Sequence, residues 1–381
     1  MEKILAISAV AMVAIFIAVF ANYKSSHVSM NTIKSGSEIG VLGMFRCGSD
    51  GVCMDSAAES LLQAKSAKEL LAQLDELGKK NGEVLLQCHP ITHSIGRMLY
   101  KKLSGEKKNI GDAFQQCDHT CHSGCFHGAM ERVFFSDDSI GAPHVTSDAL
   151  REKVPTVCEN FDYGVHGNIR FQCLHGLGHA VLFFADYNLT ESLKICDLLS
   201  SQWDQTSCYG GTFMENVHAI NKSKRYLTDS PHFPCNAVEE NYKGACYIMQ
   251  TTRMLELGLS YEGVAKECES AGDYRNMCMQ SLGRDASNDA RTNKSTAVCT
   301  SLSTEADRQY CITGLVYALS DNSWDGRYAF PYCDSLLYSY IEFCYKTTVS
   351  YLLNSLYISK ATIINSCKAH SSYADCTRLV N

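Results

Sequence analysis

Three stretches of the chain share one plan, in which 10 or 11 residues separate two cysteines: Cys196-DLLSSQWDQTS-Cys208, Cys235-NAVEENYKGA-Cys246 and Cys299-TSLSTEADRQY-Cys311. After the second cysteine an amphipathic stretch begins, as in CITGLVYALS at 311–320, where apolar side chains recur at helical spacing. A polar turn and another short helical stretch then lead to the next first cysteine. We therefore predict that each unit is a helical hairpin in which a disulfide joins the end of one helix to the start of the next.

Cysteines of this plan recur along the chain in two alternating series, at steps of 31 to 48 residues. The predicted pairs are Cys158–Cys173, Cys196–Cys208, Cys235–Cys246, Cys268–Cys278, Cys299–Cys311, Cys333–Cys344 and Cys367–Cys376. Three further expected pairs are Cys47–Cys53, Cys117–Cys125 and Cys88–Cys121, although spacing alone does not fix the partners of the last four cysteines. Such repetition is typical of a solenoid, in which each unit contacts only its neighbours.

Composition indicates a protein that works outside the cytoplasm. The chain of 381 residues contains 20 cysteines, and no two of them have the C-x-x-C spacing of a zinc ribbon. Disulfides in an oxidising compartment are therefore the better interpretation. The net charge is -7 and the basic residues are scattered, so we expect no nucleic-acid partner.

The N-terminal segment predicts export. Residues 4–21 form an unbroken apolar run of 18 residues, close to the roughly 20 that span a bilayer core. Small residues at Val19 and Ala21 also suit signal-peptide cleavage after Ala21. The segment is thus a transmembrane anchor or a signal peptide, and we expect an extracytoplasmic protein that is anchored to the membrane or secreted. Three N-x-S/T sequons, compatible with a glycoprotein, lie at Asn188, Asn221 and Asn293.

Three parts of the chain follow from these patterns. We expect a signal anchor or signal peptide at 1–22, a flexible spacer at 23–55 that contains the Cys47/Cys53 turn, and an all-α, α/α solenoid at 56–381. The amphipathic stretch SAAESLLQAKSAKELLAQLDEL at 56–77 predicts one helix that ends at Gly78 and caps the solenoid.

The architecture and the cysteine rhythm of roughly residues 85–381 resemble the disulfide-rich Sel1-like and TPR-like helical-repeat proteins. The resemblance implies an α/α solenoid with one disulfide per repeat, and it implies no particular function. The Gly-x-Gly-Val turn typical of the Sel1-like family is absent from every unit.

Histidine distinguishes the first half of the predicted solenoid (85–220) from the second (221–381), since most of the 13 histidines lie between His89 and His232. In CFHGAME (125–131) and CLHGLGH (173–179), polar side chains occupy the second and sixth positions after the cysteine. These side chains are His127 with Glu131 and His175 with His179. CHPITH (88–93) offers His89 and His93 at the same spacing, shifted by one position.

A spacing of i,i+4 places two side chains on one helix face, where both can bind a single metal ion. Because equivalent helices of a solenoid lie side by side, we predict that six residues converge on a mononuclear or dinuclear metal site: His89, His93, His127, Glu131, His175 and His179. Nitrogen and carboxylate ligands suit zinc, iron, copper or manganese. At these offsets later units carry Ile248 and Thr252, Gln280 and Arg284, and Thr313 and Tyr317, so the hairpin does not require histidine.

Two classes of function remain open at this point. A metal ion with a free coordination position would support a hydrolase or an oxidoreductase in which Glu131 or Glu215 is the general base. Glu215 lies one position later than the strict register, and Arg97 and Arg132 are candidates to receive an anionic substrate. The alternative is a non-catalytic cell-surface scaffold, whose concave face binds a protein or a glycan through the many tyrosines of the last third.

A c-type haem is disfavoured, because CDHTCH at 117–122 has three residues between its cysteines instead of two.

Overall fold

The computed structural model of the protein describes residues 40–380, apart from 49, 81–83, 85–87, 135–145, 162, 220–221, 292–296 and 373–375. The predicted membrane or signal helix at 1–22 lies outside the described residues, as do the sequons at 221 and 293. None of the helices in the described part of the chain has both the length and the apolar character that a membrane span requires.

The described residues form helices and turns, with no strand among them. In chain order the helices, with η for a 3₁₀ helix, are η1 (Val41–Cys47), α2 (Gly51–Ala64), α3 (Ala67–Lys80), α5 (His89–Gly105), α6 (Ile110–Phe114), α7 (Thr120–Val133), α8 (Ser147–Lys153), α9 (Tyr163–Phe184), α10 (Leu189–Cys196), α11 (Gln202–His218), η2 (Lys222–Lys224), α12 (Glu240–Glu256), α13 (Tyr261–Glu269), η3 (Gly272–Tyr274), α14 (Arg275–Arg291), α15 (Glu305–Asp321), α16 (Ala329–Asp334), α17 (Tyr338–Asn354), α18 (Lys360–His370) and η4 (Cys376–Val380).

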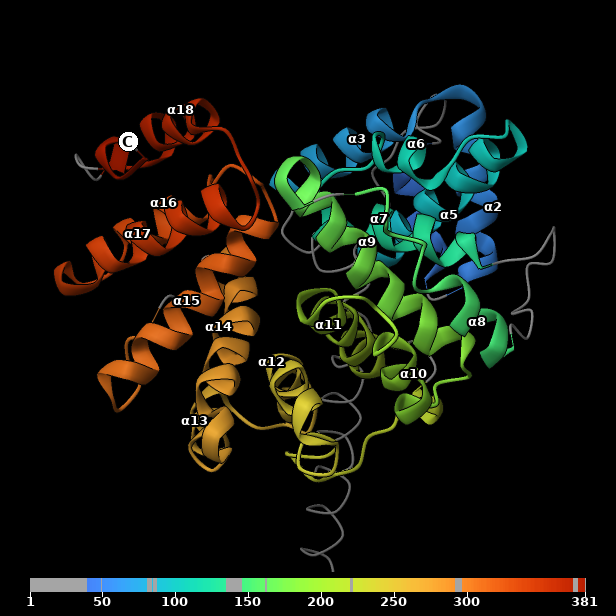
Figure 1. Ribbon diagram of the computed structural model, residues 1–381. Coiled ribbons are helices and arrows are strands. Elements are labelled where there is room, and N and C mark those ends of the chain that lie inside the picture. Colours follow the sequence, from blue (N-terminus) through green and yellow to red (C-terminus); the bar gives the residue numbers. More distant parts are fainter. Residues whose placement is uncertain are drawn as a thin grey trace, which may run out of the picture. The chain divides into compact units, whose positions relative to one another are not determined.

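A row of long helices organises the fold (Figure 1). Helix α5 packs against α7, α7 against α9 and α9 against α11, and the row continues through α12, α14, α15 and α17. The shorter helices α6, α10, α13 and α16 each contact the long helix that follows them. The prediction of an all-α protein built from helix pairs is confirmed.

Ten disulfides connect these elements. They are the seven predicted pairs and the three further expected ones, and the partners that spacing left open are Cys88 with Cys121 and Cys117 with Cys125. Cys196, the last residue of α10, is bonded to Cys208 in the second turn of α11. Cys268 near the end of α13 is bonded to Cys278 in the first turn of α14 in the same way. In the chain-entropy model, a loop of about 15 residues closed by a disulfide contributes about 3 kcal/mol, so these bonds compensate for thin helix pairs. The disulfides also indicate an oxidising, extracytoplasmic environment.

Three contacts in the row are close because glycines on one helix face the backbone of the other. A Cβ atom on Gly178 would clash with the carbonyl oxygen of Cys208, and one on Gly211 would clash with that of His175. The pairs α5 with α7 and α14 with α15 meet in the same reciprocal way, through Gly96 and Gly128 and through Gly283 and Gly314. These glycines therefore fix the register between the two helices of each pair.

A second feature repeats at this register. Arg170, eight residues before Gly178, donates two hydrogen bonds to Asp204 at 2.9 and 2.8 Å. Arg275, eight residues before Gly283, donates to Asp307 at 2.8 Å. In the α5 and α7 pair the same two positions hold Cys88 and Cys121, which form a disulfide. We call this arrangement, the reciprocal glycines together with the link that precedes them, the frame of a helix pair. The link is either an arginine–aspartate ion pair or a disulfide.

The N-terminal region differs from the prediction in three respects. The predicted helix does not end at Gly78, because α3 continues to Lys80. The stretch 56–77 is not one helix either, because α2 ends at Ala64 and α3 begins at Ala67. The physical reason is a capping box, in which the Ser66 amide donates to Glu69 at 2.7 Å and the Glu69 amide donates to Ser66 at 3.3 Å. The end of the predicted flexible spacer is also folded, since Val41 and Met44 of η1 are buried in the core.

Candidate metal centre

Histidines from three neighbouring helices meet where α5, α7 and α9 pack together. Helix α5 supplies His89 and His93, α7 supplies His127, and α9 supplies His175 and His179. In the described part of the chain, two groups of three can hold a metal ion: His89, His93 and His127, and His127, His175 and His179. Within each group, one potential ligand atom per residue lies within 4.8 Å of the others. We call them the α5 triad and the α9 triad.

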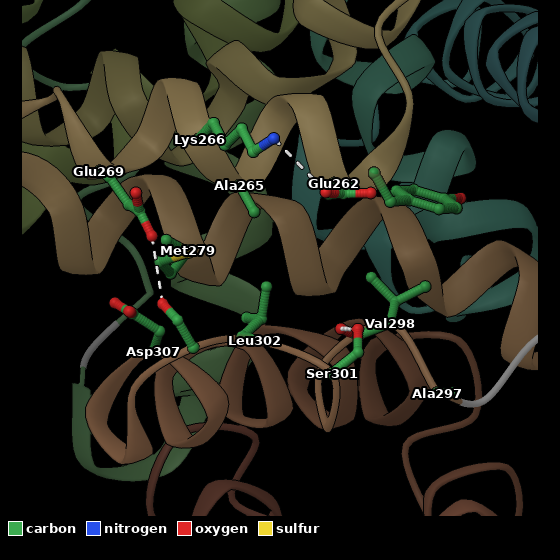
Figure 2. A pocket seen from close by; sticks show the side chains of 12 residues that line it. Glu262, Ala265, Lys266, Glu269, Met279, Ala297, Val298, Ser301, Leu302 and Asp307 are labelled. Carbon is green, nitrogen blue, oxygen red and sulfur yellow. Dashed lines mark hydrogen bonds and ion pairs between the residues drawn. The ribbon is translucent and has the colours of Figure 1, made fainter.

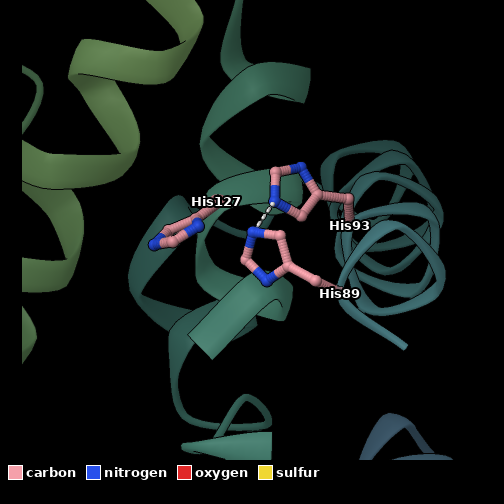
Figure 3. Close-up of side chains that lie close together, drawn as sticks. All are labelled: His89, His93 and His127. Atoms are coloured by element: carbon pink, nitrogen blue, oxygen red, sulfur yellow. Dashed lines mark hydrogen bonds between the residues drawn. The ribbon is translucent and has the colours of Figure 1, made fainter. Parts of the chain in front are cut away.

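Figure 3 shows the three side chains of the α5 triad, His89, His93 and His127, close together. The Nε2 atoms of His89 and His93 are 3.1 Å apart, and the ring of His127 lies 5.5 and 5.4 Å from theirs, measured between centroids. His89 and His93 are half-buried, whereas His127 is 2% exposed. The group therefore sits between solvent and the protein interior.

The α9 triad is buried. His127, His175 and His179 are 2, 7 and 2% exposed, and the centroids of their rings are 4.8 to 5.3 Å apart. The predicted convergence of His127 and His179 is therefore present, with their rings 4.8 Å apart. His127 belongs to both triads.

Hydrogen bonds at the outer edge of the centre fix the orientation of several imidazoles. His89 Nδ1 contacts the Cys121 carbonyl oxygen at 2.7 Å, and His93 Nδ1 contacts Glu131 at 2.7 Å. His179 Nδ1 contacts Glu215 at 2.9 Å. Carbonyl and carboxylate oxygens only accept here, so each Nδ1 donates, and in a neutral ring Nε2 then carries a lone pair. Metal-binding histidines usually have this arrangement.

His127 and His179 contain buried nitrogens without a hydrogen-bond partner among the described residues. These atoms are both ring nitrogens of His127 and Nε2 of His179. An unpaired polar atom in the interior costs about 1–3 kcal/mol, and native proteins contain few of them. Three such nitrogens within one cluster therefore need an explanation other than packing.

Burial favours the neutral form of His89, His127 and His175. It lowers the pKa of His89 and of His127 well below the ordinary histidine value, and the neighbouring histidines lower both further. Burial also lowers the pKa of His175 to about 3, and the neighbouring His179 lowers it further. Neutral imidazole is the form of histidine that binds metals.

The two carboxylates beside the centre are occupied. Glu131 accepts from His93 and, at 2.6 Å, from Arg97, which also donates to Asp55 at 2.7 Å. Burial alone would raise the pKa of Glu131, but His93 and Arg97 outweigh it and hold the pKa at about 2. Glu215 accepts from His179 and, at 3.2 Å, from the Tyr187 hydroxyl. In this arrangement both carboxylates orient histidines. Arg97 forms ion pairs with Glu131 and Asp55.

The structure brings the five predicted histidines together, with Glu131 in contact with His93 and Glu215 in contact with His179. Sequence reasoning missed Asp55, Tyr187 and Met214, whose sulfur lies 3.3 Å from His175 Nε2. Tyr187 does not fall at the offsets from cysteine that led to the histidines. The signal for Met214 was present, because it occupies the sixth position after Cys208.

A separate hollow of about 390 Å³ lies between α13, α14 and the turn that precedes α15 (Figure 2). Its floor contains Ala265, Met279 and Leu302. Around it Lys266 pairs with Glu262 at 3.4 Å. Ser303 donates a hydrogen bond to Glu269, and Asp307 accepts one from Arg275. Its chemistry is unlike that of the histidine cluster.

Comparison with protein-family models, with curated proteins and with solved structures gave no match. The disulfide-linked helix pairs are consistent with a disulfide-rich helical repeat, and the histidine geometry carries the functional argument.

Proposed function

We propose that the protein is an extracytoplasmic α/α-solenoid that binds transition-metal ions, one in each histidine triad, with His127 contributing to both. The contact between His89 and His93 is the observation that carries this proposal. Two bare nitrogen lone pairs 3.1 Å apart repel each other unless a positive charge lies between them.

A proton between the two rings would have to be carried by His93, next to Glu131, because burial and the neighbouring histidines hold the pKa of His89 well below its usual value. A metal ion fits the distance. With metal–nitrogen bonds of about 2.0–2.1 Å, nitrogens 3.1 Å apart subtend about 100° at the ion, between the octahedral and tetrahedral angles.

The unpaired nitrogens of His127 support the same proposal. Both nitrogens can coordinate once metal binding has also displaced the remaining N–H proton of the ring, so that a single buried imidazolate would bridge the two triads. The α5 triad supplies three nitrogens and borders solvent, which leaves a fourth position for water or a substrate. A hydrolase or oxidoreductase activity would use that position. Glu131 and Glu215 then act as orienting groups, because histidines occupy them.

Metal analysis of the full-length protein, purified without a histidine tag, tests the proposal. We expect near-stoichiometric zinc, iron, copper or manganese in the wild type and loss of metal from both triads in His127→Ala. His232→Ala is the matched control, because His232 contacts Glu267 and Tyr247 away from the centre. A chelator should lower the melting temperature of the wild type and of the control, and leave that of His127→Ala unchanged. Metal-free wild type whose melting is insensitive to zinc, copper and chelator would refute the proposal.

A second function, binding of a protein or glycan partner, has one observation in its favour. Leu337 and Tyr338 are adjacent at the start of α17 and are 66 and 92% exposed. Exposed apolar side chains of this kind contribute to recognition surfaces. A binding screen in which Leu337→Ser/Tyr338→Ser loses a partner, while the metal content is unchanged, would support this function.

A further inference from the structure

Met214 in α11 faces the α9 triad from the side opposite α7. Its sulfur lies 3.3 Å from Nε2 of His175. Met214 is half-buried, and the next residue, Glu215, contacts His179. One turn of α11 therefore presents a thioether and a carboxylate to two histidines of the same triad.

The contact between Met214 and His175 depends on which ring nitrogen of His175 carries the proton, because Nε2 is the nitrogen that faces the sulfur. When the proton is on Nδ1, Nε2 carries a lone pair. A thioether has lone pairs and no proton, so two electron-rich atoms then meet. This is also the tautomer in which Nε2 can bind a metal ion.

A metal ion between the two atoms resolves this contact. With a metal–nitrogen bond of about 2.0–2.1 Å and a metal–sulfur bond of about 2.3 Å, a separation of 3.3 Å corresponds to an angle of about 100° at the ion. The angle between His89 and His93 at an ion in the α5 triad would be nearly the same. The sulfur is thus placed as a ligand would be.

The register of the helices explains why a sulfur occupies this position. Three residues after the close-contact glycine, α7 carries Glu131 and α11 carries Met214. In α7 the carboxylate at this position contacts His93, the residue that corresponds to His175. In α11 the carboxylate is displaced by one residue to Glu215, where it orients His179. The displacement leaves the position beside His175 to the thioether.

We propose that Met214 is a ligand in the α9 triad and that this site takes copper(I), which thioether ligands select over harder ions. The inference rests on the proposed metal binding and extends it, because it assigns different ligand atoms and different metal ions to the two triads. The α5 triad has nitrogen ligands only and suits zinc(II) or copper(II). The α9 triad is buried and combines nitrogen with sulfur, which suits copper(I).

Anaerobic titration of the full-length protein with copper(I) against a chromophoric chelator tests the inference, together with X-ray absorption at the copper edge. Met214→Leu keeps the size and apolar character of the side chain and removes the sulfur. Met254→Leu is the control, since Met254 is a buried methionine of α12. We expect Met214→Leu to weaken copper(I) binding at least tenfold and to lose a sulfur neighbour at about 2.3 Å. The control should change the affinity by less than about twofold, and zinc(II) binding should be the same in all three proteins.

The outcomes separate this inference from the proposed function. If the wild type binds copper(I) with nitrogen neighbours alone, and Met214→Leu binds it equally well, the assignment of Met214 is wrong while metal binding stands. If the wild type takes up no metal, both proposals fail. Thermal melting in the presence of chelator shows whether Met214→Leu is folded, and a tenfold loss of affinity in a folded variant supports the inference.

Discussion

The α9 and α11 pair and the α14 and α15 pair are built on one frame and differ in what fills it. In both pairs, reciprocal glycines bring the helices together and an arginine of the first helix bonds an aspartate at the start of the second. In both, a disulfide holds the second helix to the preceding element. These shared features lie at the same register, so they specify the packing and not the chemistry.

The contents of the two pairs differ at the positions between these contacts. Where α9 has His175 and His179, α14 has Gln280 and Arg284. Arg284 donates to Asp285 at 2.7 Å and to Thr252 at 2.7 Å, so its charge is neutralised by the protein itself. The first pair instead contains imidazoles, with an unpaired nitrogen on His179. The frame thus tolerates a polar interior, and one copy of it presents histidines that can hold a metal ion.

Alanine at the close-contact glycines gives the largest expected effect, and it tests whether the frame is shared. In Gly211→Ala and in Gly314→Ala the new methyl group would clash with a backbone carbonyl, which cannot move without separating the helices. We expect each variant to lose about 3 kcal/mol or more of unfolding free energy, or to fail to fold. Urea denaturation measures this loss.

Gly105→Ala is the matched control, because a Cβ atom at this helix end meets nothing within 4 Å. It should leave stability unchanged or raise it by up to about 1 kcal/mol. A large loss in Gly211→Ala with none in Gly314→Ala would show that the two pairs do not share the frame.

Much of this frame is predictable from the sequence, because covalent and periodic signals do not depend on tertiary context. Cysteine spacing predicts most of the pairs but leaves the partners of Cys88, Cys117, Cys121 and Cys125 open, and i,i+4 spacing predicts the histidines that share a helix face. The break between α2 and α3 was missed because amphipathic periodicity continues across it, while the Ser66 and Glu69 capping box determines the boundary.

The outer part of the centre is less predictable. Asp55 reaches Arg97 from α2, 42 residues earlier in the chain, and no spacing rule connects them. Tyr187 reaches Glu215 from a turn after α9 whose Asp186 and Tyr187 have positive φ angles. Which carboxylate orients which imidazole depends on the distance between helices, and the reciprocal glycines set that distance.

His179→Arg tests the difference between the two pairs directly. The residue after the close-contact glycine is Arg97 in α5, His179 in α9 and Arg284 in α14, so arginine already fits this frame twice. We expect Glu215 to pair with the new guanidinium, so that the unfolding free energy in chelator falls by less than about 2 kcal/mol. The α9 triad should lose its metal, and the variant should bind one ion fewer than the wild type.

At a free metal concentration 100 times its Kd, one ion stabilises a folded protein by about 2.7 kcal/mol. The variant should therefore gain about that much less than the wild type on metal addition, as measured by thermal melting and metal analysis. Unchanged metal content in His179→Arg would remove His179 from the centre. Severe destabilisation in chelator would instead show that the frame does not accept arginine there.

Asp321, the last residue of α15, distinguishes the His-poor half by its response to pH. Burial raises the pKa of Asp321 to about 7, and the hydrogen bond from Tyr351 at 2.8 Å opposes this effect. Between about pH 4 and pH 7 the folded protein keeps a proton that the unfolded chain has released, so stability falls as the pH rises. The slope approaches about 1.4 kcal/mol for each pH unit.

Asp321→Asn removes this titration and can still accept the Tyr351 hydrogen bond. In chelator, the variant should therefore gain up to about 2 kcal/mol relative to the wild type between pH 5.5 and pH 7.0, measured by urea denaturation. Tyr351→Phe should shift the inflection to higher pH, because the hydrogen bond that lowers the pKa is lost. Since both proteins contain the same histidines, their titration cancels in the difference. A stability difference that stays constant over this range would show that Asp321 is ionised in the folded protein.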